Sequence, residues 1–152
     1  MTIVDRKGNI FDSEASAIGH GVNTYGVMGA GIAKQVRERF PYVYSVYRSS
    51  CDSGNFLPGM TIPVQDPETG VWILNLASQE RPGADARLEW LEEALSETLR
   101  QMSNMGWTSL ALPQIGAGIG GLEWDDVRAM IVELSGEYPE ITIELWEFAT
   151  NE

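Results

Sequence analysis

Two glycine-rich stretches and the polar residues beside them are the part of this sequence that can do chemistry. The first ends in Gly29, Ala30 and Gly31 and leads into the helical pattern IAKQVRERF. Glycines at such a junction allow positive φ angles and a close approach of backbone to ligand, while the free N–H groups of the following helix face an anion. We therefore interpret this stretch as a phosphate-binding loop.

The second stretch has the same character. The apolar run LALPQI is followed by GAGIGG, and then by the helix-like EWDDVRAMIVELSG. Two strand-loop-helix junctions of this kind suit a ligand with two phosphates. The residues expected along this second loop are Gly116, Ala117, Gly118, Ile119 and Gly120.

His20 and Asn23 enter the first loop and are the candidate catalytic pair. His20 is the only histidine, and histidine is the side chain that ordinarily titrates near neutral pH. It can donate to a phosphate oxygen or act as a general acid or base. A lone histidine at a strand end is also a common structural residue, and both interpretations stay open.

Candidate contacts for a base lie at the two ends of the chain. Asn9 follows Gly8 in a turn, where turn chemistry and pairing with a purine edge are both possible. Trp146 and Phe148 alternate along the last apolar run and should share a face. Packing in the core is the usual role of such residues, and stacking on a base is the alternative.

Composition narrows the classes of protein. With 22 acidic and 10 basic residues, the net charge of −12 disfavours a broad nucleic-acid surface. No apolar run approaches the roughly 20 residues of a membrane helix, and Cys51 alone cannot form an internal disulfide. One histidine and one cysteine do not make a zinc site. We expect a cytoplasmic protein with no metal and no membrane partner.

The elements that must hold these residues alternate along the chain. Apolar runs predict strands over 2–5, 16–22, 60–64, 71–77, 107–112 and 141–148, and helical spacing predicts helices over 29–40, 42–51, 84–105 and 124–134. This order predicts one α/β domain over residues 1–152, with a mixed, mostly parallel central sheet of about six strands between layers of helices.

A nicotinamide dehydrogenase is an alternative, because Gly116, Gly118 and Gly121 form a literal GxGxxG. Glu144 or Glu147 would then bind a ribose. The motif lies late in the chain, however, and too few residues follow it to complete a dinucleotide fold. No P-loop motif is present.

The ordered set of motifs resembles the macrodomains, which are modules for ADP-ribose. The resemblance rests on KGNIF, GHGVNTYGVMGAGIAKQ and LPQIGAGIGGLEW, and it spans nearly the whole chain. The branch that holds the fungal ADP-ribose-1″-phosphate phosphatase and the terminal ADP-ribose protein glycohydrolase is the most similar, with the phosphatase closer.

This resemblance implies a role for each candidate residue. Asn9 and Ile10 would contact adenine, with Trp146 and Phe148 near the base. The two glycine loops would hold the diphosphate and the distal ribose from opposite sides. Asn23 would bond the distal ribose, and His20 would lie beside the reacting phosphate or C1″.

The sequence also departs from that branch. The glycohydrolases of the branch use a lysine nucleophile and an aspartate, and the motif alignment places Leu76 and Gly120 at those positions. A mechanism through a lysine is therefore not expected. Asp85 is a candidate for a second carboxylate near the site.

The sequence thus predicts an ADP-ribose-binding domain that hydrolyses a derivative at the distal ribose, either ADP-ribose-1″-phosphate or a mono-ADP-ribosyl ester. It needs no cofactor, and an ADP-ribosylated protein is a possible partner. The alternative is a reader that binds ADP-ribose without turnover.

Overall fold

The computed structural model describes residues 2–148. A six-stranded sheet forms the centre of the molecule, and its strands lie in the order β1-β6-β5-β2-β4-β3. Five strands are parallel, and β3 pairs antiparallel with β4. This is the predicted α/β sheet, although the outer residues of the single domain predicted over 1–152 lie outside the described ones.

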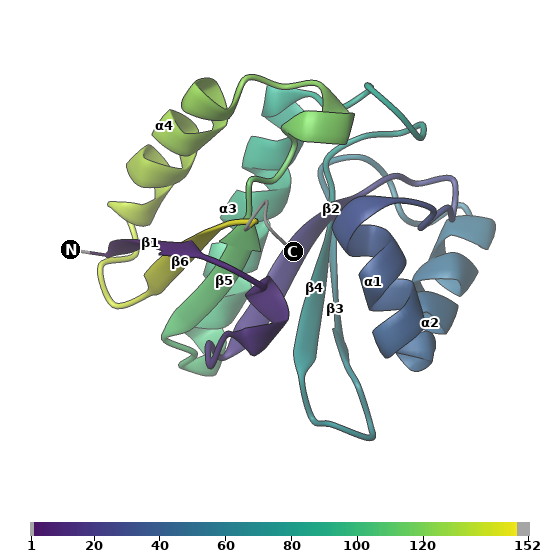
Figure 1. Ribbon diagram of the computed structural model, residues 1–152, viewed down its shortest axis with the longest axis horizontal. Helices are drawn as coiled ribbons and strands as arrows, with labels where there is room; N and C mark the ends of the chain where they lie inside the picture. Colours follow the sequence, from purple (N-terminus) through teal and green to yellow (C-terminus); the bar gives the residue numbers. More distant parts are fainter. Residues whose placement is uncertain (1, 149–152) are drawn as a thin grey trace.

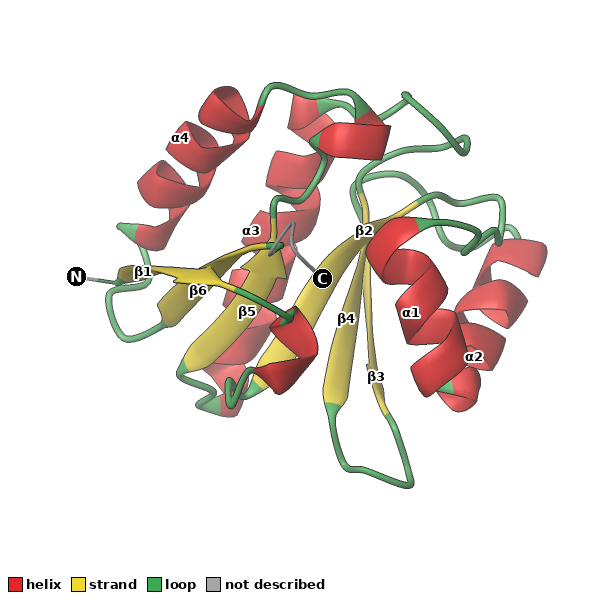
Figure 2. Ribbon diagram, in the orientation of Figure 1, coloured by secondary structure: helices red, strands yellow, loops and turns green. Residues whose placement is uncertain are grey.

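The strands and α-helices follow one another along the chain in the order that the periodicity predicts. The strands are β1 (Ile3–Lys7), β2 (Ala17–Val22), β3 (Thr61–Gln65), β4 (Trp72–Ala77), β5 (Ser109–Pro113) and β6 (Thr142–Glu147). The α-helices are α1 (Gly31–Arg39), α2 (Pro41–Asp52), α3 (Leu88–Met105) and α4 (Trp124–Ser135), and two short 3₁₀ helices are η1 (Ile10–Asp12) and η2 (Gly118–Gly120) (Figures 1 and 2). None of the helices in this part of the chain is long and apolar enough to cross a membrane.

Two apolar cores make the molecule a three-layer sandwich. One lies between the sheet and the pair α3 and α4, where Leu95 and Ile131 are fully buried. The other lies between the sheet and the pair α1 and α2, around Val36 and Tyr47. The apolar run of β4, interrupted by Asn75, fits this arrangement, because a strand covered on both faces needs apolar side chains on both.

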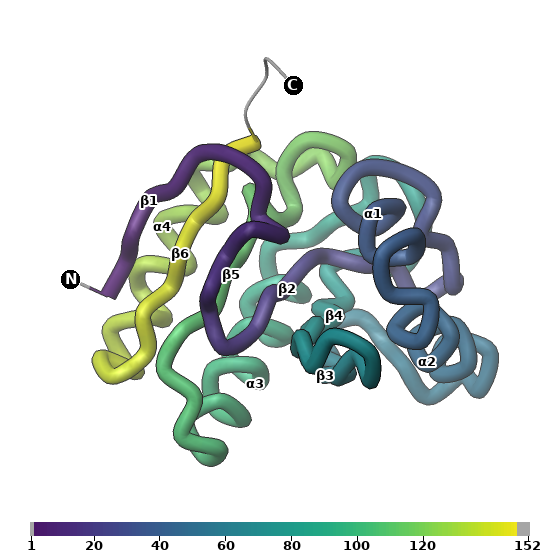
Figure 3. Tube along the Cα trace, turned by 60° about the horizontal axis from the view of Figure 1, so that its bottom comes forward, coloured from purple at the N-terminus to yellow at the C-terminus, as the bar shows by residue number. Residues whose placement is uncertain are grey.

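The order of the strands places a switch point between β2 and β5. The chain leaves β2 toward α1 and α2 on one face, and it leaves β5 toward α4 on the other. In open α/β sheets a ligand binds outside the carboxyl ends of the strands at such a point. Figure 3 shows the strands side by side, with the purple β1 next to the yellow β6 although they lie at opposite ends of the chain.

Candidate functional site

A cavity of about 580 Å³ lies at the carboxyl ends of the five parallel strands. Each of these strands contributes to its lining at or just beyond its last residue: Gly8 after β1, Asn23 after β2, Ser78 after β4, Gln114 after β5 and Phe148 after β6. Cavities that bind small molecules and cofactors have volumes of about 300–1,000 Å³. The cavity is therefore large enough for a nucleotide with a diphosphate and two sugars.

The N-terminus of α1 forms one wall of this cavity. Gly29, Ala30, Gly31, Ile32 and Ala33 all line it. Ala30 is the N-cap residue, with extended φ −153° and ψ 160°, and no side chain caps the helix or places an acid in its first turn. The first N–H groups of a helix have no partner within it. They are thus available to an anion in the cavity.

The second glycine loop forms the opposite wall. Gly116 to Gly120 line the cavity, and η2 also begins without a side-chain cap. Gly118 has φ +65°, which strongly favours glycine. Ile119 reaches across toward the first loop, because its Cδ1 lies 3.6 Å from the point where a Cβ on Gly31 would stand. The two loops therefore approach each other over the cavity.

The side chain of Asn23 makes most of its hydrogen bonds to the loop that follows β2. Its Oδ1 accepts from the backbone N–H groups of Tyr25 and Val27, at 3.0 and 3.2 Å, and from the hydroxyl of Tyr47 at 2.9 Å. Its Nδ2 donates to the carbonyl of Val27 at 2.8 Å. The carboxamide thus shapes residues 23–27. The expected bond to a distal ribose stays a prediction, to be made by the second N–H of Nδ2.

Helix α2 holds this loop through the hydroxyl groups of two tyrosines. The Tyr47 hydroxyl is buried and also lies 2.7 Å from the backbone carbonyl of Asn23, while Tyr44 donates to the carbonyl of Gly26 at 3.3 Å. Burial raises the pKa of Tyr47 far above its usual value, so that the hydroxyl stays protonated and can donate. Tyr44 and Tyr47, which lie about one turn apart on α2, thus hold the loop beside the cavity.

Tyr47→Phe is expected to destabilise the protein by about 1–2 kcal/mol, because Asn23 loses its buried donor. Chemical or thermal unfolding measures this loss. Tyr42→Phe, on the exposed face of α2, is the matched control and should leave the stability unchanged. Equal stability of the two variants would mean that the Tyr47 hydroxyl does not hold the loop.

His20 is almost wholly buried, at 1% exposure, and also lines the cavity. Its Nε2 lies 2.7 Å from Oδ1 of Asn75, the residue opposite it in the register of β2 and β4. Burial lowers the pKa of His20 to about 4, against a smaller opposite effect of the hydrogen bond to Asn75. The imidazole of the unliganded protein is therefore neutral at pH 7 and has no spare proton to give as a general acid.

The low pKa of His20 predicts a loss of stability between about pH 6.5 and pH 4. The unfolded chain takes up a proton at a pKa of about 6.5, whereas the folded chain does so only near 4. Folding is thus favoured above pH 6.5 and opposed progressively below it, by about 3 kcal/mol at the lower end. His20→Gln removes this titration, and its unfolding free energy should fall less steeply over the same window. Parallel curves for the two proteins would contradict the prediction.

Ser78 and Gln79 are cavity residues that the sequence analysis missed. Ser78 is 1% exposed and fits because Gly21 has no side chain; a Cβ there would lie 2.7 Å from the Ser78 hydroxyl. Nε2 of Gln79 donates to the carbonyls of Arg81 and Gly83, at 2.6 and 2.9 Å. Their positions in the sequence could have identified them, since both residues directly follow the apolar run of β4 and ligands bind beyond the carboxyl ends of such strands.

Two sequence expectations, for Asn9 and Asp85, meet a different geometry. Asn9 does not line the cavity, although Gly8 and Ile10 do, because its Oδ1 accepts from the N–H of Phe11 at 3.0 Å and caps η1. Its Oδ1 is thus engaged in the cap, and the contact with adenine stays a prediction. Asp85 is also absent from the lining. Its carboxylate accepts from the N–H groups of Arg81 and Glu80, which lower its pKa and tie down the loop.

The structure corrects the motif alignment that places Leu76 at the position of the lysine nucleophile. Its side chain is fully buried in the core between the sheet and α3, and it does not line the cavity. A lysine at this position could not reach a ligand. Gly120, by contrast, does line the cavity. The residues just beyond β4 that face the cavity are Ser78 and Gln79, and neither has an amine.

The lining is almost without charge. Among the described residues that line it, none is a lysine, arginine, aspartate, glutamate or cysteine, and His20 is neutral. Within residues 2–148, no group of three or more histidine, cysteine or carboxylate side chains is placed to hold a metal ion. An anion bound here would interact with backbone N–H groups and with neutral side chains.

The geometry does not support the dehydrogenase alternative. Glu144 accepts from the Ser13 hydroxyl at 2.6 Å and from Nε1 of Trp146 at 3.0 Å, and neither it nor Glu147 lines the cavity. The acid proposed for a ribose is therefore engaged elsewhere. Trp146 and Phe148 both line the cavity, and the contact of this aromatic pair with a base stays a prediction.

Comparisons with known proteins agree with this geometry. A DNA ADP-ribosyl glycohydrolase of Thermus aquaticus is 30% identical over 150 residues, covering 95% of this chain and 41% of the relative. The ADP-ribose 1″-phosphate phosphatase of Candida albicans is 24% identical over 140 residues, covering 84% of this chain and 90% of the relative. The bacterial protein is thus more similar than the fungal one, and this chain spans about two fifths of its length.

The solved structure of the macrodomain of Mycobacterium tuberculosis DarG superposes with a TM-score of 0.88 at 26% identity, covering 95% of this chain and 96% of the other. The family model described as "Macro domain" matches residues 20–131, well over half of the sequence. This match begins at His20 and includes both glycine loops. The chain belongs to the macrodomain family.

Proposed function

We propose that this protein binds ADP-ribose and hydrolyses an ADP-ribose derivative at the distal ribose. The observation that carries the proposal is one cavity with the uncapped start of α1, at Ala30, on one wall and the second glycine loop, from Gly116 to Gly120, on the other. The start of α1 offers free N–H groups to one phosphate, and the glycines of the second loop let its backbone come close to the other. Trp146 and Phe148 supply apolar surface for a base at the side of β6.

The chemistry would rest on positioning and on electrostatic stabilisation. The backbone N–H groups of the two loops would hold the diphosphate, and a water molecule near C1″ or its phosphate would be the nucleophile. Asn23 remains the candidate orienting group, and His20 remains the candidate base. This role suits the neutral imidazole better than that of an acid.

Three substrates follow from the site and the relatives. ADP-ribose-1″-phosphate and a mono-ADP-ribosyl ester on protein are those that the sequence predicts. The similarity to bacterial DNA ADP-ribosyl glycohydrolases adds mono-ADP-ribosylated DNA. The net charge of −12 opposes a broad contact with nucleic acid. A single modified nucleotide entering the cavity would not need such a contact. A cytoplasmic setting is also part of the proposal and rests on the single Cys51.

Incubation with these three substrates tests the proposal. Release of phosphate or of ADP-ribose is measured for the wild type and for His20→Ala, and calorimetry compares ADP-ribose with NAD. We expect tight binding of ADP-ribose and turnover of at least one substrate. Binding without turnover would identify a reader. A preference for NAD over ADP-ribose would contradict the proposed ligand. An active His20→Ala variant would remove only the role of that residue.

A further inference from the structure

His20 and Asn75 form a buried polar pair at the inner end of the cavity. The two residues are opposite each other on β2 and β4, and they are 1% and 0% exposed. Their side chains share the face of the sheet that α1 and α2 cover, since Ile18, Val22, Ile73 and Ala77 belong to that core. The 2.7 Å contact between Nε2 and Oδ1 joins them.

The orientation of Asn75 decides which nitrogen of His20 carries hydrogen. Nδ2 of Asn75 donates to the backbone carbonyl of Ile62 on β3, at 3.0 Å. A carbonyl oxygen only accepts, so this bond fixes Nδ2 toward β3 and Oδ1 toward His20. Oδ1 is itself an acceptor. The hydrogen-bond network therefore assigns the hydrogen to Nε2 of His20.

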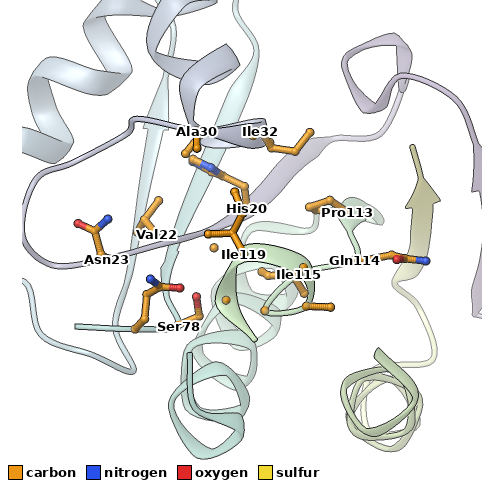
Figure 4. Close-up of a pocket in the computed structure, with 18 of the residues that line it drawn as sticks. His20, Val22, Asn23, Ala30, Ile32, Ser78, Pro113, Gln114, Ile115 and Ile119 are labelled. Carbon is orange, nitrogen blue, oxygen red and sulfur yellow. The ribbon is translucent and has the colours of Figure 1, made fainter. Parts of the chain in front are cut away.

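Nδ1 of the neutral ring is then a bare acceptor. It is the one buried side-chain nitrogen or oxygen among residues 2–148 that has no hydrogen-bond partner. His20 lines the cavity, and Figure 4 shows its ring extending toward Ala30 at the start of α1. Leaving a buried acceptor unpaired costs about 1–3 kcal/mol. A donor from a bound molecule would remove this cost, after a shift of the ring or of the start of α1 that brings the buried Nδ1 to the surface of the cavity.

We propose that Asn75 is a positioning residue, which holds His20 as the Nε2–H tautomer so that Nδ1 accepts a hydrogen bond from a hydroxyl group of the bound ADP-ribose derivative. The inference rests on the proposed function. A bare Nδ1 requires a hydrogen-bond donor, so it would bind a sugar hydroxyl and not an ionised phosphate oxygen, which has no hydrogen to donate. The adenine amino group is the other donor of the ligand, and the aromatic pair at β6 would hold the base.

The single histidine makes a direct test possible. In protein labelled with ¹⁵N-histidine, long-range ¹H–¹⁵N spectra at pH 7 report the protonation of each ring nitrogen of His20 without overlap. We expect a protonated Nε2 and a bare Nδ1 in the free protein. Saturation with ADP-ribose should move the Nδ1 resonance toward that of a hydrogen-bonded nitrogen and leave Nε2 in place.

Asn75→Asp tests the positioning role. An aspartate cannot donate to the Ile62 carbonyl, and its charge favours the doubly protonated ring, in which Nδ1 no longer accepts. The His20 resonances should change toward those of imidazolium at pH 7, and saturation with ADP-ribose should no longer give the Nδ1 shift that the wild type shows, because a protonated Nδ1 cannot accept. Asn104→Asp, at an exposed position of α3, makes the same change of charge and should alter neither.

Each result bears on one part of the proposal. An Nδ1–H tautomer in the wild type would overturn it, whether or not the Asn75 variant folds. ADP-ribose binding by calorimetry with no change at Nδ1 would overturn the ligand contact and leave the proposed function intact. Absence of ADP-ribose binding would overturn the proposed function and the ligand contact together, while the spectrum of the free protein would still decide the role of Asn75.

Discussion

Ala30→Asp is expected to raise the thermal stability of the protein and to weaken ADP-ribose binding by about 30-fold or more. Ala30 is the N-cap of α1, with the extended backbone that a capping side chain requires, yet its own side chain cannot cap. An aspartate in this position accepts from the first N–H groups of a helix, and replacing alanine by such a residue contributes about 0.5–2 kcal/mol. The stability should therefore increase.

The same carboxylate would occupy the site expected for the ligand. Ala30 lines the cavity at the start of α1. There the new side chain would take up N–H groups that a phosphate would otherwise bind. Its charge would also repel the diphosphate, by about 2–4 kcal/mol at a separation near 4 Å in a partly screened setting. Calorimetry for affinity and thermal unfolding for stability measure the two opposite effects in one variant.

Ala30→Asn separates the cap from the charge. Asparagine caps as well as aspartate does but adds no negative charge. It should stabilise the protein to a similar extent and cost much less affinity. If the aspartate variant bound ADP-ribose as tightly as the wild type, the start of α1 would not be a phosphate site, and the proposed orientation of the ligand would be wrong.

Periodicity predicted the elements of the fold because each strand and helix has its own apolar pattern. The run 71–77 became β4 (Trp72–Ala77), and the pattern 124–134 became α4 (Trp124–Ser135). The helix predicted from residue 84 begins only at Leu88. The reason is local: the carboxylate of Asp85 and the carboxamide of Gln79 bond to backbone groups of residues 80–83 and hold them in a loop. Such bonds compete with a helix.

Motifs predicted the walls of the cavity better than its inner end. The glycine loops stood out because a ligand that approaches the backbone requires unusual residues in consecutive positions. The pair of His20 and Asn75 did not, because it joins residues 55 positions apart and depends on the register of β2 with β4. A single sequence contains no sign of that register. The side-chain network of Asn23 with Tyr47 on α2 was hidden for the same reason.

Leu76→Lys is expected to prevent folding, whereas Gln79→Lys is expected to leave the fold intact. Leu76 is fully buried between the sheet and α3. Loss of a buried leucine alone costs about 2–5 kcal/mol. Burial of an unpaired ammonium adds several more. Together these costs reach the whole stability of a typical domain, about 5–15 kcal/mol. Circular dichroism and chemical unfolding should show no cooperative transition.

Gln79 is the matched position beyond the same strand. It is only partly buried and lines the cavity, and its Nε2 donates to two backbone carbonyls that an ammonium group could also serve. Gln79→Lys should therefore unfold cooperatively near the wild-type temperature. It should also bind ADP-ribose more tightly, because a cation would face a cavity that otherwise lacks one. Leu76→Met, which keeps the volume, should cost less than about 1.5 kcal/mol.

These variants decide where an amine nucleophile could stand in this fold. Cooperative folding of Leu76→Lys with tighter ligand binding would return position 76 to the cavity and contradict the geometry. The expected result places the position from which an amine could reach the ligand at residue 79, where this chain has the carboxamide of Gln79. A carboxamide nitrogen is not basic and does not form a Schiff base with a sugar carbonyl. The hydrolysis proposed above would then use water rather than an amine as its nucleophile.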